Sequence, residues 1–251
     1  MPRVTVVTGA SSGIGLAMVE ALAADGVLVV GVDVADPPPA AIRPAWVAGD
    51  VTSDRTWGLV RDAVMELDPE GPDAFVSCAA DLVVGPFLGT PVEAWRRLYE
   101  VNVLGAVRGM QALLPSMVRR GRGAVVAVCS VDSLFADDQL SAYATSKAAL
   151  LHVVRSAALE HARDGVRVNA VCPGSVDTAL LRRAVEALRG DASVEDVLSA
   201  ASARIPTGRI LQPTDVVGAI RFLLSDDAAM ISGAAVVVDG GLTTSYDFAR
   251  G

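Results

Sequence analysis

Short valine-rich runs alternate with longer stretches of helical period along most of the chain, and this alternation constrains the fold more than any other feature. The apolar runs lie at 3–8, 27–33, 45–50, 73–78, 123–130, 166–172 and 234–241. The stretches of helical period lie at 13–25, 54–67, 91–119, 140–163 and 213–225. Such alternation implies right-handed crossovers and a parallel sheet with helices on both faces. We therefore predict an α/β fold with a doubly wound, seven-stranded parallel sheet.

One segment departs from this alternation. Residues 178–206 contain two helix-like pieces with no strand between them. An insertion at this place is a candidate lid over a site, with a packing or oligomer contact as the alternative. Because no stretch has the composition of a linker, we predict a single domain over residues 1–251 that carries this helical lid.

Charge and cysteine content exclude several classes of function. The formal net charge of -8 argues against a nucleic-acid partner, because such binding depends on clustered Lys and Arg. The three cysteines lack the spacing of a zinc site or a disulfide framework, so we expect no metal site and free thiols in a reducing compartment. The chain begins "MPRVTVVTGA", without a basic-then-apolar leader, and no apolar run is long enough for a membrane span. We expect a cytoplasmic protein with no membrane partner.

A glycine-rich turn, "TGASSGIG" (8–15), follows the first predicted strand and opens a helix. Backbone N–H groups and the positive end of the helix dipole can hold a pyrophosphate there without any cationic side chain. The order of strand, turn, helix and second strand is that of the dinucleotide-binding Rossmann fold. A phosphate-binding Walker A loop would need a lysine here, and none is present.

The same turn also contains "GASSG" (9–13), which matches the nucleophile elbow of a hydrolase with Ser11 as nucleophile. Such an enzyme needs a histidine after its nucleophile and acid, but both histidines of the chain lie within one predicted helix. The hydrolase alternative is therefore weak.

The second predicted strand ends in Asp33. A carboxylate at this position can accept both hydroxyls of an adenosine ribose and would repel a 2'-phosphate. An arginine that binds this phosphate would be expected at position 11, 12, 34 or 35, but these positions hold Ser11, Ser12, Val34 and Ala35. We therefore predict NAD as the cofactor.

The chain has a single lysine, Lys147, among 21 Lys and Arg residues, and Tyr143 stands four residues before it. This spacing places the two side chains on one face of a helix. Ser130 ends the preceding predicted strand, so a hydroxyl, a phenol and an ammonium are expected at the edge of the sheet where a dinucleotide would lie.

The energetics link these residues to the glycine turn. Lowering the pKa of a tyrosine from about 10 to roughly 7 requires about 4 kcal/mol. A cation about 6 Å away supplies under ~3 kcal/mol at an effective dielectric constant of about 20. The lysine alone is therefore insufficient, and a positively charged nicotinamide ring is needed to supply the remainder.

Taken together, these residues resemble the short-chain dehydrogenase/reductase family in its shorter, single-domain branch. The resemblance covers the whole chain and is carried by "TGASSGIG", Asn102 in "YEVNVLGA", Ser130, "YATSK" (143–147), "VNAVCPGSVDT" (168–178) and "DDAAMISGAAVVVDGG" (226–241). It implies a homotetramer and a secondary-alcohol dehydrogenase or ketone reductase. A 3-oxoacyl-thioester reductase and a non-catalytic nucleotide-sensing protein are the alternatives.

The resemblance also implies roles for individual residues. Tyr143 would be the general acid/base, Lys147 would lower its pKa and hold the nicotinamide ribose, Ser130 would bond the reacting oxygen, and Asn102 would hold a proton-relaying water. The implied cofactor contacts are Gly9, Ser11, Ser12, Gly13, Ile14, Gly15, Asp33, Asp50, Val51, Ala79, Tyr143, Lys147, Pro173, Val176 and Thr178. The expected substrate contacts are Asp81, Ser130, Asp132, Gln139 and Tyr143.

Two features leave the substrate open. The family usually has Asn-Asn-Ala-Gly after the fourth strand, where this chain has Ser77, Cys78, Ala79 and Ala80, so the hydrogen bonds at that strand end must be arranged differently. The predicted lid carries Arg182, Arg183 and Arg189, which are interpreted as a solvated face, with an anionic substrate group as the alternative.

Overall fold

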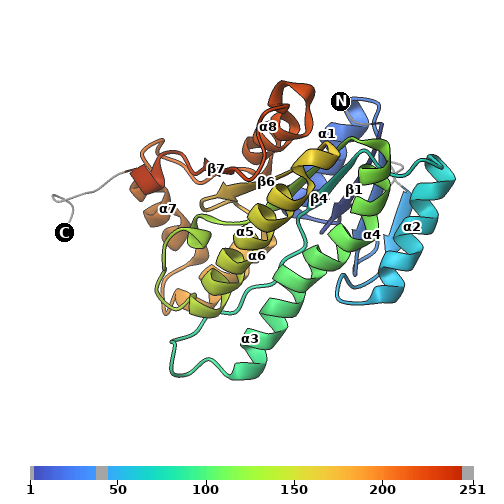
Figure 1. Cartoon of the computed structure of the whole chain (residues 1–251). Helices are drawn as coiled ribbons and strands as arrows, with labels where there is room; N and C mark the ends of the chain where they lie inside the picture. Colours follow the sequence, from blue (N-terminus) through green and yellow to red (C-terminus); the bar gives the residue numbers. More distant parts are fainter. Residues whose placement is uncertain (1–2, 38–44, 245–251) are drawn as a thin grey trace.

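The computed structural model describes residues 3–37 and 45–244, and the strands in these ranges form one sheet in the order β3-β2-β1-β4-β5-β6-β7 (Figure 1). All neighbouring strands run parallel. The predicted seven-stranded, doubly wound sheet of the Rossmann type is confirmed. The strands are β1 (Val4–Thr8), β2 (Leu28–Asp33), β3 (Ala45–Ala48), β4 (Ala74–Ser77), β5 (Gly123–Val128), β6 (Val166–Pro173) and β7 (Ala235–Val238).

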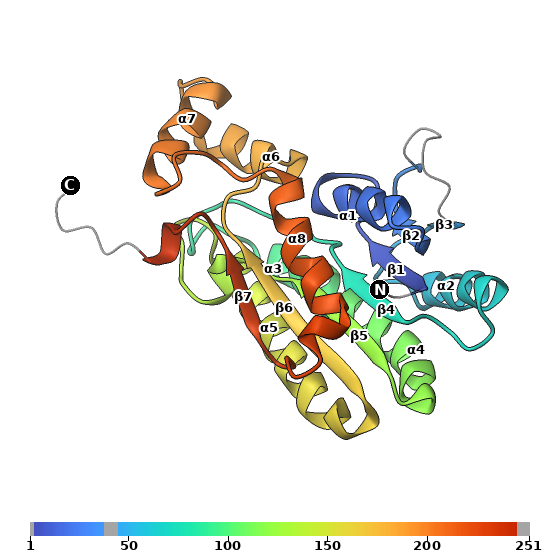
Figure 2. The same ribbon diagram turned by 90° about the horizontal axis from the view of Figure 1, so that it is seen from above.

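Helices connect the strands and cover both faces of the sheet (Figure 2). They are α1 (Gly13–Ala24), α2 (Asp54–Leu67), α3 (Val92–Tyr99), α4 (Gly105–Arg120), α5 (Ser141–His161), α6 (Ala179–Leu188), α7 (Val194–Arg204) and α8 (Pro213–Leu224). The predicted helix at 91–119 consists of α3 and α4 joined by a π-helical turn, η1 (Glu100–Leu104). A short 3₁₀ turn, η2 (Val131–Ser133), follows β5.

Two hydrophobic clusters fill the space between the sheet and its helices. One lies under α2, α4 and α5 and includes Trp57, Met117 and Leu150, all nearly inaccessible to solvent. The other lies under α1 and α8 and includes Met18 and Ile220. Because both faces of the strands are buried, their sequences are almost uniformly apolar instead of alternating.

The strand order reverses at β1, because the chain passes from β1 to β2 on one side and later places β4 on the other. Crossover helices diverge from such a point and leave a crevice at the carboxyl ends of the strands. The glycine turn after β1 and the segment after β4 both lie at this edge.

The residues predicted as a helical insertion, 178–206, contain α6 and α7 with no strand between them. The Thr178 hydroxyl accepts a hydrogen bond from the Leu181 amide at 3.3 Å and caps α6. The Ser193 hydroxyl caps α7 through the Asp196 amide at 3.1 Å. These caps satisfy amides that a helix start leaves without partners.

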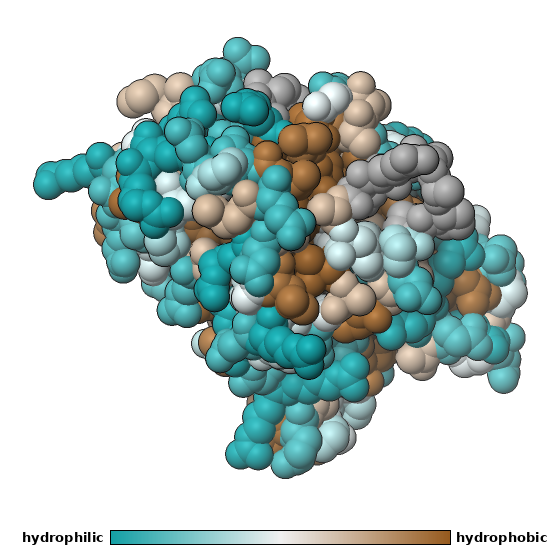
Figure 3. Space-filling view, turned by 90° about the vertical axis from the view of Figure 1, so that its right-hand side faces the viewer, coloured by the Kyte–Doolittle hydropathy of each residue, from teal (hydrophilic) through white to brown (hydrophobic). Residues whose placement is uncertain are grey.

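The surface has both hydrophilic and hydrophobic regions. On the face shown in Figure 3, hydrophobic residues gather in a central band bordered by hydrophilic ones. A separate groove of about 760 Å³ lies along α4 and α5, and its lining includes Met110, Leu114 and Val153. Within the described residues, no helix combines the length and the apolar character that crossing a membrane requires.

Candidate active site

In the turn between β1 and α1, the backbone of the glycines lies very close to other backbone segments. A Cβ on Gly15 would lie 2.0 Å from the Gly9 carbonyl oxygen, and one on Gly9 would lie 2.9 Å from the Ala79 nitrogen. Gly9 also has a φ of 65°, which glycine adopts without strain. Ser12, the N-cap residue of α1, forms no side-chain capping bond, so the first amides of this helix are available to a ligand.

Asp33 is held in place at the end of β2. Its Oδ2 accepts hydrogen bonds from the Ser11 amide at 3.0 Å and the Ser11 hydroxyl at 2.8 Å. Its Oδ1 accepts a bond from the Ala35 amide at 3.1 Å. An ionised carboxylate can accept about four hydrogen bonds, so Asp33 retains capacity for a ribose hydroxyl. The turn and this carboxylate together fit the pyrophosphate and the adenosine ribose of a dinucleotide.

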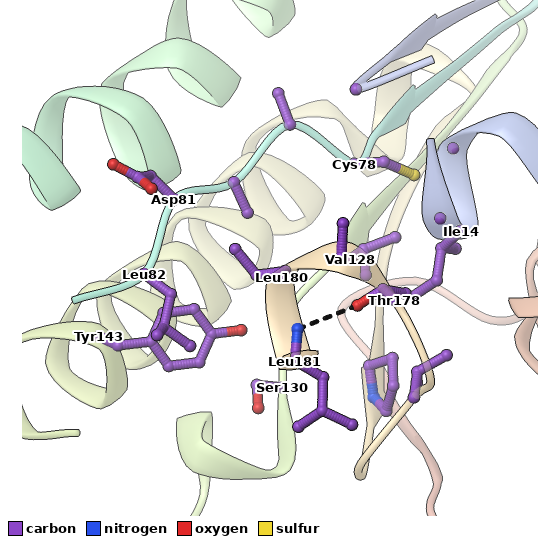
Figure 4. Close-up of a pocket in the computed structure, with 18 of the residues that line it drawn as sticks. Ile14, Cys78, Asp81, Leu82, Val128, Ser130, Tyr143, Thr178, Leu180 and Leu181 are labelled. Carbon is purple, nitrogen blue, oxygen red and sulfur yellow. Dashed lines mark hydrogen bonds between the residues drawn. The ribbon is translucent and has the colours of Figure 1, made fainter. Parts of the chain in front are cut away.

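A single cavity of about 590 Å³ joins this turn to Tyr143 (Figure 4). All the cofactor contacts expected from the sequence line it: Gly9, Ser11, Ser12, Gly13, Ile14, Gly15, Asp33, Asp50, Val51, Ala79, Tyr143, Lys147, Pro173, Val176 and Thr178. Of the expected substrate contacts, Asp81, Ser130, Asp132 and Tyr143 also line the cavity. Gln139 is not among the lining residues, and its amide Nε2 lies 3.3 Å from the Asp138 carboxylate.

Tyr143 and Lys147 project from the same face of α5 and are almost fully buried, with exposed fractions of 8% and 2%. The Lys147 Nζ donates to the Val128 carbonyl at 2.8 Å and lies 5.7 Å from the centre of the Tyr143 ring. Burial raises the pKa of Tyr143, and the nearby Asp132 carboxylate raises it further. Burial also lowers the pKa of Lys147. The phenol is therefore neutral in the protein alone, as the sequence-based energy argument requires.

Ser130 lies at the end of β5, and its side chain occupies the cavity with Tyr143 (Figure 4). Its hydroxyl donates to the Asp132 carboxylate and accepts from the Asp132 amide, both at 3.1 Å. Burial raises the pKa of Asp132, while its bond to Ser130 opposes this effect. The η2 turn thus fixes the orientation of the Ser130 hydroxyl.

Asn102 lies in the π-helical turn and is buried outside the cavity lining. Its Oδ1 accepts from the Asp81 amide at 2.7 Å, and its Nδ2 donates to the Asp81 carbonyl at 2.9 Å and to the Ser146 hydroxyl at 2.9 Å. Asn102 therefore connects the segment after β4 to α5, the helix that carries Tyr143.

The strand end with the unusual "SCAAD" sequence is held by a residue that the sequence did not indicate. The Thr8 hydroxyl accepts from the amides of Cys78 and Ala79, each at 3.2 Å. Burial raises the pKa of the Cys78 thiol to about 12, so this thiol is neutral. A threonine in a β-strand is too common for its side-chain bonds to be predicted without tertiary contacts.

The Asp81 carboxylate contacts two arginines. Its Oδ2 lies 2.9 Å from the Nε of Arg97 on α3, and its Oδ1 lies 3.6 Å from Nη2 of Arg183 on α6. Arg97 lines the cavity, and the sequence did not identify it, because "EAWRRLYE" is typical of an amphipathic helix with a solvated face. In Figure 4, Asp81 points away from the Tyr143 hydroxyl.

Comparisons with known proteins all indicate the same group of related enzymes. A family model described as enoyl-(acyl carrier protein) reductase matches residues 9–243. The cis-4-hydroxycyclohexanecarboxylate dehydrogenase of Sinomonas cyclohexanicum is 38% identical over 96% of this chain and 96% of its own length. The 2-(R)-hydroxypropyl-CoM dehydrogenase of Xanthobacter autotrophicus is 34% identical over 97% of this chain and 99% of its own. The solved structure of Thermoplasma acidophilum aldohexose dehydrogenase superposes with a TM-score of 0.92 at 31% identity, covering 99% of this chain and 97% of that one.

Proposed function

Because the chain belongs to the short-chain dehydrogenase/reductase family, whose members use a nicotinamide cofactor, we propose that this oxidoreductase transfers a hydride between NAD(H) and a secondary alcohol or ketone. One observation carries the proposal: Ser130, Tyr143 and Lys147 line the same cavity as the glycine turn. A cofactor bound at that turn would extend toward the hydroxyl groups of Ser130 and Tyr143. The relatives are dehydrogenases of alcohols, which supports the reaction class.

Side chains of the protein transfer the proton and position the substrate. The deprotonated Tyr143 oxygen takes the proton of the alcohol in oxidation, and the Tyr143 hydroxyl gives a proton to the carbonyl oxygen in reduction. The Ser130 hydroxyl, which donates to the Asp132 carboxylate, can accept a hydrogen bond from the alcohol at its second lone pair, and it donates to a ketone oxygen once its proton turns away from Asp132. The Lys147 ammonium stabilises the phenolate and holds the nicotinamide ribose. When bound, the nicotinamide ring takes up or supplies the hydride.

We expect NAD and not NADP. The Asp33 carboxylate is held by the Ser11 amide and hydroxyl and by the Ala35 amide, so it can accept a further bond from a ribose hydroxyl without reorganising. A 2'-phosphate at the same place would lie against this negative charge, and none of the four positions 11, 12, 34 and 35 is an arginine.

The substrate side of the cavity favours an alicyclic alcohol over an acyl thioester. Its walls include Leu82, Leu180, Leu181 and Leu188, which suit a compact apolar ring. The relative from Sinomonas cyclohexanicum is named for a hydroxycyclohexane substrate, which supports this class. The acidic chain, with its net charge of -8, disfavours docking of an acidic acyl carrier.

Two further features belong to the proposal. Residues 178–206 act as a lid within a single domain, because α6 contributes Leu180, Leu181 and Ala184 to the cavity. The protein forms a homotetramer, and the apolar groove along α4 and α5 supports a helix-to-helix contact between copies.

The test is a panel of secondary alcohols and ketones assayed with NAD and NADP side by side, using the wild type and Tyr143→Phe. We expect turnover with NAD, and a loss of about 10³-fold in Tyr143→Phe with unchanged NAD affinity, because the phenyl ring keeps the packing but cannot move a proton. A preference for NADP would contradict the role of Asp33.

The same variant separates an enzyme from a nucleotide sensor. A sensor would bind NAD without turning over any alcohol, and Tyr143→Phe would leave its properties unchanged. Cofactor-free ester cleavage that disappears in Ser11→Ala would instead support the hydrolase interpretation of the glycine turn.

A further inference from the structure

The contact between Asp81, Arg97 and Arg183 joins three elements at the substrate end of the cavity. Asp81 follows β4, Arg97 lies on α3, and Arg183 lies on α6. The main chain of Asp81 is fixed on both sides by Asn102, so the carboxylate has a defined position. The Asp81 side chain is 14% exposed, whereas those of Arg97 and Arg183 are 71% and 66% exposed. Two largely exposed guanidinium groups therefore contact one nearly buried carboxylate; Arg97 lines the cavity, whereas Arg183 is not among its lining residues.

The charges at this place do not balance. Two guanidinium groups share one carboxylate, which leaves a local charge of about +1 in a protein whose net charge is -8. The neighbouring arginines of α3 and α6 do not share an acid in this way. Each of them contacts at least one acidic side chain of its own. Arg96 contacts Glu93, Arg182 contacts Asp177 and Glu195, and Arg189 contacts Glu186.

Donor groups remain available on both arginines. Arg97 contacts Asp81 through Nε, so its two terminal nitrogens are not used in that contact. Arg183 contacts Asp81 through Nη2 at 3.6 Å, which is longer than a normal hydrogen bond. A guanidinium carries five N–H donors in a planar fork that matches a carboxylate or a sulfonate. The pair can therefore accept an additional anionic group without losing Asp81.

Besides Asp81, which the arginines contact, four other acidic residues line the cavity, Asp33, Asp50, Asp132 and Asp137, and they would bias the orientation of a charged ligand. Asp132 contacts Ser130, and Asp137 also lines the cavity. An anionic group would be repelled from this side and attracted to the arginines. In Figure 4, Asp81 and Ser130 lie on opposite sides of Leu82 and Tyr143, so the ends of the substrate would be distinguished by charge.

We propose that Arg97 and Arg183 bind an anionic group, a carboxylate or sulfonate, at the end of the substrate remote from the reacting carbon, and that Asp81 positions the two guanidinium groups. This inference rests on the proposed function and specifies its substrate class: an alicyclic secondary alcohol with a remote negative charge. Asp81 then acts through the arginines and not by bonding a substrate hydroxyl. Since Arg183 belongs to α6, binding of the anion would also favour the position of the lid over the site.

The test compares 4-hydroxycyclohexanecarboxylate with its carboxamide, which has the same ring but no charge. We expect wild type to prefer the carboxylate in kcat/KM. The preference should fall about 10- to 100-fold in Arg97→Gln, Arg183→Gln and the double variant, because charge-assisted hydrogen bonds are lost. Turnover of the carboxamide should fall less than turnover of the carboxylate. Arg96→Gln and Arg182→Gln, whose arginines are paired with their own acids, are the matched controls and should keep the preference.

Two outcomes would overturn the inference. An equal loss on both compounds in Arg183→Gln would mean that the contact with Asp81 only holds α6 in place. A wild-type enzyme that turns over the carboxamide as well as the carboxylate would show that no anion site exists. Binding of cyclohexanecarboxylate to the NAD-loaded protein, measured by calorimetry in wild type and Arg97→Gln, provides a readout without turnover. If this binding depends on Arg97 but no alcohol is oxidised, the anion site stands and the proposed function fails.

Discussion

At the scale of single residues, Tyr143 and Lys147 are buried in the candidate site, and burial disfavours the charged form that each is proposed to use. Burial raises the pKa of Tyr143 and lowers that of Lys147, so burial by itself favours neither the phenolate nor the ammonium. A bound nicotinamide cation would stabilise the phenolate, because opposite charges attract strongly in a low-dielectric cavity. Tyr143, as the proposed acid/base, and the glycine turn are therefore expected to function only together.

The single lysine should not tolerate replacement by arginine. Its Nζ donates to the Val128 carbonyl at 2.8 Å from a side chain that is 2% exposed, and a planar guanidinium does not fit this position. We expect Lys147→Arg to lose about 10²-fold in kcat and to bind NAD more weakly, measured by steady-state kinetics and calorimetry. Arg155→Lys, on the exposed side of the same helix, is the control. A Lys147→Arg enzyme with normal turnover would show that the solitary lysine has no chemical role.

Asp132 should set the pH dependence of alcohol oxidation. Its carboxylate raises the pKa of Tyr143, so removing its charge in Asp132→Asn should lower that pKa. Oxidation requires the deprotonated phenol, and the rise of kcat/KM with pH should therefore move to lower pH. The amide oxygen can still accept the bond from Ser130. Asp138→Asn, at an exposed position that does not line the cavity, should leave the profile almost unchanged. A shift to higher pH in Asp132→Asn would contradict this assignment.

At the scale of elements, the backbone at the start of α1 packs closely against the turn that follows β1. The close approach of Gly15 to the Gly9 carbonyl is possible only without a side chain, and it sets the helix amides at the edge of the sheet. The π-helical turn between α3 and α4 has a similar positioning role, since it carries Asn102 to Asp81 and Ser146. Both features are local irregularities that orient groups of the site.

Gly15→Ala should therefore damage both stability and cofactor binding. Its Cβ would lie 2.0 Å from backbone, and we expect a loss of about 1–3 kcal/mol in the free energy of unfolding together with a loss of NAD affinity. Gly218→Ala in α8 is the matched control, because a Cβ there meets nothing within 4 Å. This control should gain about 0.5–1 kcal/mol through its higher helix propensity. Urea unfolding and calorimetry measure the two quantities, and a Gly15→Ala protein that binds NAD normally would contradict the assignment of the turn.

At the scale of the whole molecule, the sheet brings together groups that are far apart in the sequence. The reversal of strand order at β1 opens the crevice, and the carboxyl ends of β1, β2, β4, β5 and β6 each contribute residues to one cavity. The remaining apolar surface along α4 and α5 is the basis for the proposed contact between copies.

The proposed contact between copies can be tested by introducing one charged side chain into the groove. Val153 is partly buried in the groove along α4 and α5, and a glutamate there would be left without water in a helix-to-helix interface. We expect Val153→Glu to convert the tetramer to smaller species in size-exclusion chromatography with light scattering. Leu59→Glu on α2, where leucine is 45% exposed, is the control and should leave the mass unchanged. An unchanged tetramer in Val153→Glu would exclude this face as the interface.

The sequence by itself determined the class of fold and the chemical groups of the site. Hydrophobic periodicity is a local property, so the strands and most helices could be predicted within a few residues, and the spacing of Tyr143 and Lys147 fixed their shared face. The glycine turn and Asp33 were recognised because their chemistry is carried by consecutive backbone and strand-end positions.

Only the tertiary structure decided which distant side chains meet. The joining of Asp81 to Arg97 and Arg183, the support of Cys78 and Ala79 by Thr8, and the position of Gln139 outside the cavity lining depend on how separate elements pack. A single arginine on an amphipathic helix has the same local signal whether it faces water or a cavity. Its partner is set by long-range geometry, so the sequence identified the family and the groups proposed for catalysis, while the fold showed that Arg97 and Arg183 meet at Asp81.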